Sequence, residues 1–257
     1  MLDWDRLTLF LYITVRMAGF VLFTPFFGRA NVPNTFKAGF TLVLAMAANG
    51  IYTGEVLPMP VTLLEFAVRL ILELGMGFLV GVVMNIFLFV PSYAGHIMDE
   101  QMGMAMAQTY DPSFQGQATP ASNVLNIFSL LIFFSANGHH TLLRLMLDSG
   151  GVVPFGTAAL GSQAAEKVAA LFIDCTLLSI KLCLPVLGAE LMGQVGMGVL
   201  MKAIPQINVF AINIELKVLI GLSMLYFLLA PISEFLLTME NTMLLEVEKA
   251  IALATGG

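Results

Sequence analysis

Long apolar stretches alternate with short polar ones along the whole chain. The apolar segments cover about residues 7–27, 36–53, 61–90, 124–147, 165–191 and 207–237. Several of them reach the roughly 20 residues that a helix needs to cross a bilayer. They lack the strict alternation of apolar and polar residues that a transmembrane β-barrel requires. The pattern therefore predicts an all-α protein built from membrane-type helices, because only helices and closed barrels satisfy their backbone groups in lipid.

The stretches between these segments are rich in Pro, Gly, Asn and Asp, and we expect turns there. They fall at residues 24–35, 53–62, 148–157 and 201–208. The last residues, 239–257, are predicted to form an amphipathic tail that can lie on a surface. No internal repeat divides the chain, so residues 1–257 are expected to form a single domain. The acidic start MLDWDRL is unlike a signal peptide, and the first apolar segment is expected to remain in the mature protein.

The composition indicates a protein with little of its surface exposed to water. The 257 residues are 58% hydrophobic and only 11% charged, with a mean hydropathy of +0.91. Soluble domains carry about 25% charged residues. The net charge of −6 and the scattered positions of the 11 basic residues argue against binding to nucleic acid, which needs clustered Lys and Arg. We expect the solvent of this chain to be lipid or other apolar protein.

The apolar segments nevertheless contain charges. Arg16 lies in the first segment, and Glu65, Arg69 and Glu73 follow one another at i,i+4 spacing in the third. That spacing places these three on one helical face, where Arg69 is expected to be neutralised from both sides. A charge at the lipid-facing centre of a helix costs about 2.5–3.5 kcal/mol, so these helices are expected to face protein or water. Two interpretations stay open: a paired structural network, or a path for protons or ions.

Other motifs indicate packing rather than chemistry. Gly77 and Gly81 form a GxxxG pair, which lets a neighbouring helix approach closely. Cys175 and Cys183 lie eight residues apart in one apolar segment, too far for a disulfide on a helix, and are interpreted as small buried hydrophobes. The three histidines show no zinc-binding spacing, and neither GxSxG nor HExxH occurs. The sequence therefore predicts no enzyme, no metal and no cofactor.

The segment MDEQMGMAMAQTYDPSFQGQATP, residues 98–120, combines two unusual features. Four methionines fall between Met98 and Met106, and Asp111, Pro112 and Gly116 follow in a run that favours a loop. Methionine adapts its shape to changing neighbours, but an ordinary helix core would also use it. A polar loop between apolar segments must lie outside lipid, inside protein or in a water-filled cavity. An ordinary surface loop and a loop that closes a channel both meet that condition.

Five stretches together resemble the FliR/SctT family of type III export-gate proteins, with the flagellar branch the more similar. They are, in chain order and in the order that the family has them, TPFFGRANVPNTFKAGFTLVLA, ELGMGFLVG, AGHIMDEQMG, EQMGMAMAQTYDPSFQGQ and PQINVFAINIELKVLIGL. The resemblance covers nearly the whole chain. The sequence departs from the family pattern at His96, at Phe114 and Gln115 in the loop, and at Glu215. These departures concern details of the loop and not the overall resemblance.

The resemblance implies an architecture and partners. A single subunit of this kind assembles with FliP-like and FliQ-like subunits into a cone of helical hairpins that lie side by side. The cone belongs to the flagellar basal body at the bacterial inner membrane, next to FlhB-like and FlhA-like export components, and unfolded export substrates pass through it.

The resemblance also implies which residues close the channel. A plug loop at about residues 107–122 would lie next to a constriction flanked by Met102, Met104 and Met106. Carried over residue by residue, the plug consists of Tyr110, Asp111, Pro112, Ser113, Phe114, Gln115, Gly116 and Gln117. A soft apolar seal and a displaceable polar loop would suit a gate that passes chains of every composition. The alternatives are a small secondary transporter or ion channel with broken helices, and a membrane-embedded scaffold without a pore.

Overall fold

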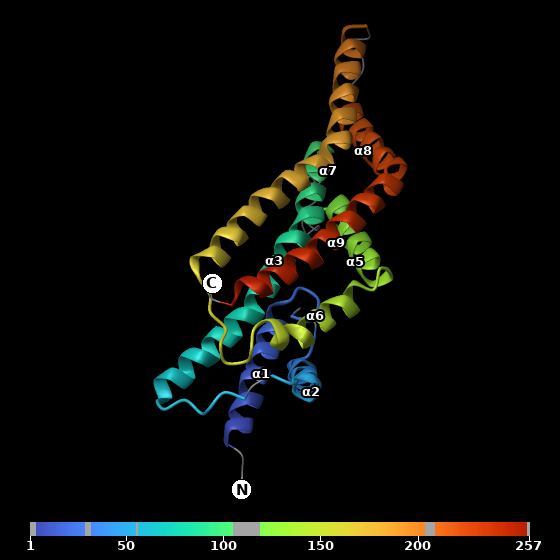
Figure 1. Cartoon of the computed structure of the whole chain (residues 1–257). Coiled ribbons are helices and arrows are strands. Elements are labelled where there is room, and N and C mark those ends of the chain that lie inside the picture. The colour runs from blue at the N-terminus through green and yellow to red at the C-terminus, as the bar shows by residue number, and fades with distance from the viewer. Residues whose placement is uncertain (1–3, 29–31, 55, 105–118, 204–208, 256–257) are drawn as a thin grey trace. The chain divides into compact units, whose positions relative to one another are not determined.

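The computed structural model describes residues 4–28, 32–54, 56–104, 119–203 and 209–255. Within these ranges the chain is helical, apart from turns and one isolated bridge between Ala159 and Thr255, which confirms the all-α prediction. Figure 1 shows the helices along the chain. They are α1 (Trp4–Phe23), α2 (Asn34–Ile51), α3 (Leu63–Gln101), α5 (Pro120–Ser135), α6 (Gly138–Val152), α7 (Ser162–Ala203), α8 (Val209–Phe227) and α9 (Leu229–Leu253).

Contacts divide the chain into two compact units. The first comprises residues 1–87, 137–173 and 240–257, and the second comprises residues 88–136 and 174–239. The long helices α3 and α7 each contribute one part to either unit. Each unit is therefore assembled from segments that are far apart in the sequence.

The first unit is built around α1. Its core holds fully buried apolar side chains from α1 and α3, among them Ile13, Met17, Phe20, Val80 and Val83. Helix α2 packs against α1 and also contacts α6. Figure 1 shows α1 and α2 as neighbours, with α6 near them.

The end of α9 completes the first unit. Met243, Val247 and Ile251 recur every four residues and are nearly inaccessible to solvent, so one face of the helix is buried. Glu246, which is also buried, forms an ion pair with Lys167 of α7 at 2.7 Å. The predicted tail at 239–257 is thus amphipathic over its described helical part, and its apolar face is buried. Its residues up to Leu253 continue a helix that begins at Leu229, because their apolar face finds a partner inside the fold.

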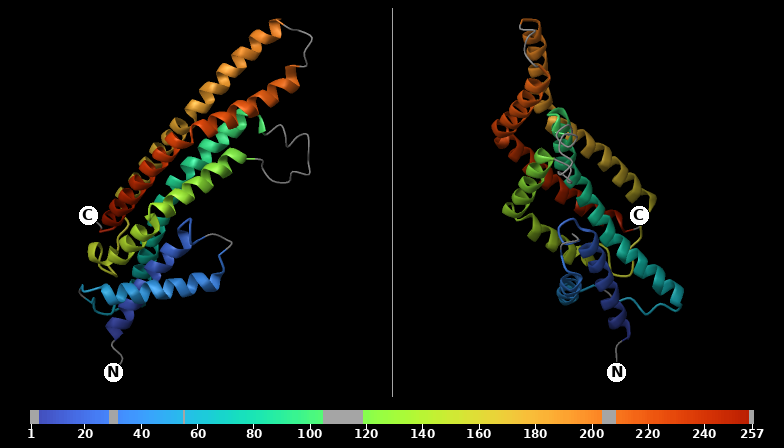
Figure 2. Two further views of the ribbon diagram at one scale, coloured as in Figure 1. Left: turned by 90° about the vertical axis from the view of Figure 1, so that its right-hand side faces the viewer. Right: turned by 180° about the vertical axis from the view of Figure 1, so that it is seen from behind.

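The second unit consists of helical hairpins. The end of α3 and the whole of α5 run side by side in opposite directions, as do the later part of α7 and α8 (Figure 2). Met98, Leu125, Cys183 and Val186 belong to its buried core. Cys175 and Cys183 are both buried free thiols, and Cys183 Sγ donates to the carbonyl of Ile180 at 3.2 Å, so the prediction that both are buried is confirmed.

Two of the apolar segments form bent pairs of helices. The segment at 124–147 bends by 65° between α5 and α6, where Asn137 adopts a left-handed conformation with φ 58°. Asparagine tolerates that conformation better than most residues. The segment at 207–237 bends by 62° between α8 and α9. Pro231 accounts for the second bend, because its ring lacks an N–H and collides with the carbonyl four residues earlier, that of Phe227.

Among the described residues, helices α1, α3 and α7 are long and apolar enough to cross a membrane, and the count rises to as many as five if each bent pair forms one span. Helices α3 and α7 also extend beyond their apolar segments, to Gln101 and Ala203. Length and composition thus support the prediction of membrane-type helices.

Candidate functional site

Hydrogen bonds join α3 and α5, the two helices that flank the predicted plug segment. The hydroxyl of Ser92 donates to Asn126 Oδ1 at 2.8 Å, and the hydroxyl of Ser122 donates to the carbonyl of Ser92 at 3.1 Å. Next to these bonds Gly95 lies against the backbone of Ser122 so closely that a Cβ on Gly95 would lie 2.9 Å from the carbonyl carbon of Ala121. The two helices are therefore in backbone contact, and no larger residue fits at position 95.

Asp99 adds a further contact between the two helices at the start of α5. Its Oδ1 accepts a hydrogen bond from the backbone N–H of Ala121 at 3.0 Å, and its Oδ2 accepts one from Ser122 at 3.1 Å. The Asp99 side chain is 3% exposed. The first N–H groups of a helix have no partner within the helix, and they form a partial positive charge that favours a carboxylate. A carboxylate on α3 therefore caps the N-terminus of α5.

The end of α3 is formed by the QMG motif. Met102 donates its backbone N–H to the carbonyl of Met98, and Gly103 then takes φ +76°, which ends the helix. The Met102 side chain is fully buried against α8, where its Sδ would lie 2.7 Å from a Cβ placed on Gly221. Met104 is half-buried. Met102 is thus part of the core of the second unit, while Met104 remains partly accessible.

The residues predicted to form the plug, 110–117, lie outside the described residues, and so does Met106. The sequence predicts that the loop ends at about residue 122. Helix α5 already begins at Pro120, because proline is favoured at the first helical position and Asp99 satisfies the N–H groups that follow it.

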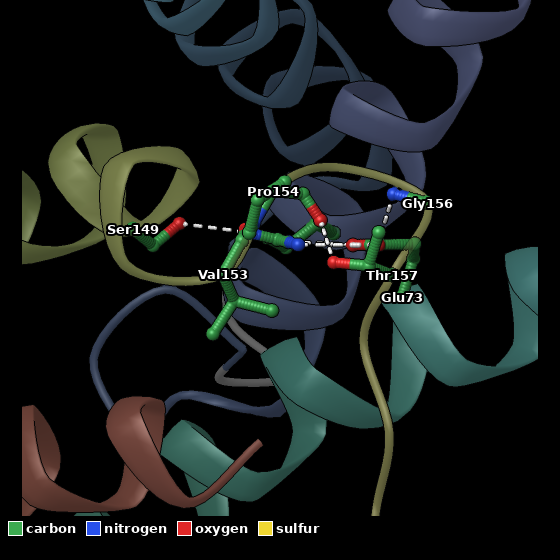
Figure 3. Close-up of polar contacts among 7 residues, drawn as sticks. Glu73, Ser149, Val153, Pro154, Gly156 and Thr157 are labelled. Atoms are coloured by element: carbon green, nitrogen blue, oxygen red, sulfur yellow. Dashed lines mark hydrogen bonds and ion pairs between the residues drawn. The ribbon is translucent and has the colours of Figure 1, made fainter. Parts of the chain in front are cut away.

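A second polar cluster lies in the first unit around Arg16 and Glu73, both fully buried (Figure 3). The guanidinium binds the carboxylate through two hydrogen bonds, Nε to Oε2 at 2.5 Å and Nη2 to Oε1 at 3.1 Å. Its Nη1 donates to the hydroxyl of Ser149 at 3.2 Å and to the carbonyl of Val153 at 2.9 Å. This bidentate pair joins α1 to α3.

The same cluster holds the connection between α6 and α7. Glu73 Oε1 accepts the backbone N–H of Gly156 at 2.7 Å, and the ring of Phe155 lies 4.2 Å from the guanidinium carbon of Arg16. Gly156 has φ +90°, a conformation that favours glycine. The buried pair therefore fixes a loop whose backbone groups would otherwise lack partners.

The expected ladder of Glu65, Arg69 and Glu73 is only half present. Arg69 donates to Glu65 at 2.6 Å, and their side chains are 29% and 41% exposed. Glu73 binds Arg16 instead, so the expectation that Arg69 is neutralised on both sides is wrong. The helical spacing permitted both contacts, but the buried carboxylate needs a buried cation, and Arg69 lies nearer the surface. With both partners of the deep pair inaccessible and fully bonded, the geometry favours a structural network over a path for protons.

Gly77 and Gly81 lie where α1 crosses α3 within the same chain. A Cβ on Gly77 would lie 2.5 Å from the carbonyl oxygen of Arg16, and one on Gly81 would lie 2.6 Å from that of Phe23. Gly19 on α1 meets α3 at the same crossing. The close helix approach that the GxxxG spacing predicts is thus made by α1.

Sequence reasoning missed Asp99 altogether and noted Arg16 only as a charge. Their partners lie 22 and 23 residues away for Asp99 and 57 residues away for Arg16, beyond any local rule. Among the described residues no three His, Cys, Asp or Glu side chains gather in a way that could hold a metal ion. The site offers packing and helix capping, and its polar groups are already paired with one another.

Comparison with known proteins identifies the family. Residues 7–243 match the family described as bacterial export proteins, family 1. The flagellar biosynthetic protein FliR of Caulobacter vibrioides is 25% identical over 221 residues, which cover 86% of this chain and 88% of that protein. FliR of Escherichia coli is 26% identical, with 91% of this chain and 88% of that protein covered.

A relative with another name matches over most of its length too. The surface presentation of antigens protein SpaR of Shigella sonnei is 23% identical over 215 residues, with 82% of this chain and 81% of that protein covered. Since the family match spans nearly all of the helices described above, the chain belongs to the FliR/SctT family of bacterial export proteins.

Proposed function

We propose that this chain is the FliR-like subunit of a flagellar type III export gate at the bacterial inner membrane. In this role it forms the export channel with FliP-like and FliQ-like subunits, next to FlhB-like and FlhA-like components, and unfolded export substrates pass through. The observation that carries the proposal is the family match over residues 7–243, with flagellar FliR proteins as relatives over most of their length. The apolar helices α1, α3 and α7 support a place in the membrane-associated part of the apparatus.

An exposed apolar stripe on α7 supports assembly with other helices. Its side chains are 40–70% exposed and follow one another in steps of three or four residues, with one step of seven: Leu177, Ile180, Leu184, Leu191 and Val195. Such heptad-like spacing is typical of a face that packs against another helix in a left-handed pair. We therefore assign this stripe to the interface with a neighbouring gate subunit.

The assembly is tested by purifying the tagged chain from its own cells. Co-purification of FliP-like and FliQ-like proteins in a fixed ratio is the expected result. Leu184→Glu should abolish it, whereas Lys181→Glu, at an exposed and already charged position of the same helix, should not. A lone oligomer that binds one small solute would instead favour a transporter. Normal co-purification of the Leu184→Glu chain would show that the stripe is not part of the interface.

Within the gate we propose that residues 110–117 act as the plug. The support is the loop-forming composition of this segment, its resemblance to the family's loop, and the paired helix ends of α3 and α5 on either side. A loop of this composition buries few apolar groups, so its removal should cost little stability.

The plug is tested by deleting residues 111–117. The deleted gate should assemble and should pass small ions or solutes when no substrate occupies the channel. Met104→Ala should add to the leak, because a smaller side chain seals less, and Met104→Leu should leak less than Met104→Ala. Met104 is a sharper choice than Met102, whose side chain is buried in the core. An assembled gate that stays tight without residues 111–117 would show that another part closes the channel.

A further inference from the structure

The first turn of α5 has an unusual cap. Pro120 is its first helical residue, and Thr119, which stands in the N-cap position, makes no side-chain cap hydrogen bond. An N-cap side chain normally accepts from the N–H groups of the second and third helical residues. In α5 these belong to Ala121 and Ser122, and the carboxylate of Asp99 on α3 accepts both.

A cap supplied from another helix acts differently from a local one. A side chain in the N-cap position stabilises its helix wherever that helix lies. Asp99 stabilises α5 only while the first turn of α5 remains at the end of α3, so capping and docking depend on each other. The carboxylate is 3% exposed and both of its oxygens are engaged, so it is not available to bind a further partner.

The surroundings of Asp99 are rigid enough for such a role. Met98 and Met102, on either side of it, are fully buried, and Gly95 one turn earlier touches the backbone of Ser122. The bond between Ser92 and Asn126 lies about two turns before Asp99. The end of α3 therefore offers a fixed position against which the start of α5 can be held.

We propose that Asp99 is a positioning residue that ties the first turn of α5 to the end of α3 and so fixes the distance between the two ends of the connection 105–118. Its importance for the closed gate rests on the proposed plug function. Its effect on the two helices does not, and this allows the two ideas to be tested separately.

The structural arm of the test measures the separation of the two helices in the purified complex. Spin labels are attached at Tyr93→Cys on α3 and Val124→Cys on α5, both exposed positions, while the native cysteines are buried. Asp99→Ala should displace a large share of α5 from its seated position, seen as lost dipolar broadening. An unchanged spectrum would overturn the proposal.

A second variant separates positioning from simple helix capping. Thr119→Asp supplies a local carboxylate at the N-cap of α5 but gives it no bond to α3. In the Asp99→Ala background it should restore the helicity of the first turn without restoring the spin–spin separation. If the double variant also regains the parent separation, Asp99 serves only to stabilise α5, and its positioning role is refuted.

The functional arm measures the leak of small solutes through assembled gates. Asp99→Ala should leak with the loop intact, the added Thr119→Asp should not cure that leak, and Asp99→Ala should add nothing once residues 111–117 are deleted. A gate that leaks on loop deletion but not with Asp99→Ala refutes the role of Asp99 in closure. A gate that stays tight on loop deletion refutes the plug, and the spin-label result then decides the positioning role alone.

Discussion

Replacing Arg16 by Leu should destabilise the first unit more than the loss of any exposed charge. The substitution removes the guanidinium that binds Glu73, the hydroxyl of Ser149 and the carbonyl of Val153. Glu73 is left fully buried, with the N–H of Gly156 as its remaining hydrogen-bond donor. Breaking one side of a buried pair leaves an uncompensated charge in an apolar environment.

The size of the effect follows from this uncompensated charge. Removal of one partner of a buried pair typically costs about 3–5 kcal/mol. At 1.4 kcal/mol per tenfold, that lowers the ratio of folded to unfolded protein by roughly one hundred- to several thousand-fold. Arg144 provides the matched control, because its ion pair with Asp148 has a length of 3.6 Å and its side chain is 85% exposed. Arg144→Leu should cost under about 1 kcal/mol.

The assay is unfolding of the purified chain in mixed micelles, followed by the circular dichroism of its helices as denaturing detergent is added. The double variant Arg16→Met/Glu73→Leu should recover part of the loss caused by Arg16→Leu, since it leaves no buried charge unpaired but still leaves the carbonyl of Val153 and the N–H of Gly156 without these partners. If Arg16→Leu unfolds no more easily than Arg144→Leu, the buried pair does not stabilise the fold. If the double variant is as unstable as the single one, the lost loop hydrogen bonds and packing, and not the unpaired charge, are responsible.

Three further outcomes follow from the contacts of single residues. Arg69→Leu should cost under about 1 kcal/mol in the same titration, because its pair is partly exposed and the deeper carboxylate has another partner. Gly77→Leu should abolish folded protein in membrane extracts, whereas Gly39→Leu, where nothing lies within 4 Å of an added Cβ, should not. Gly221→Val should push Met102 out of its buried position and raise its oxidation to the sulfoxide, measured by mass spectrometry.

The helical architecture was predictable because hydropathy dominates this chain. Each expected apolar segment corresponds to one helix or to a bent pair of helices. The ends of the helices were less predictable. Helix α3 continues past its apolar segment through HIMDEQ to Gln101. These residues still pack within the second unit, and the helix ends just before Gly103, which takes a positive φ. Hydropathy depends only on residue type, whereas a helix ends where the pattern of backbone hydrogen bonds changes.

Charge pairing shows where local rules stop. The i,i+4 rule gave the pair of Glu65 and Arg69 correctly, since both lie on one exposed helical face. The same rule failed for Glu73, which lies one turn further along and is fully buried against Arg16 of another helix. Spacing along one helix determines only which side chains on that helix can reach one another. A buried charge needs a buried partner, and whether a residue is buried depends on helices that are distant in the sequence.

The two buried polar clusters have a common physical reason. A connection between apolar helices carries backbone N–H and C=O groups that lipid cannot satisfy. Arg16 and Glu73 bind such groups in the connection after α6, and Asp99 binds the first free N–H groups of α5. Removing one member of a charged pair buried at a connection costs more than removing a charge on an exposed face. Substitutions of Arg16, Glu73 and Asp99 should therefore be less tolerated than those of Arg144 or Lys181, although nothing in their local sequence sets them apart.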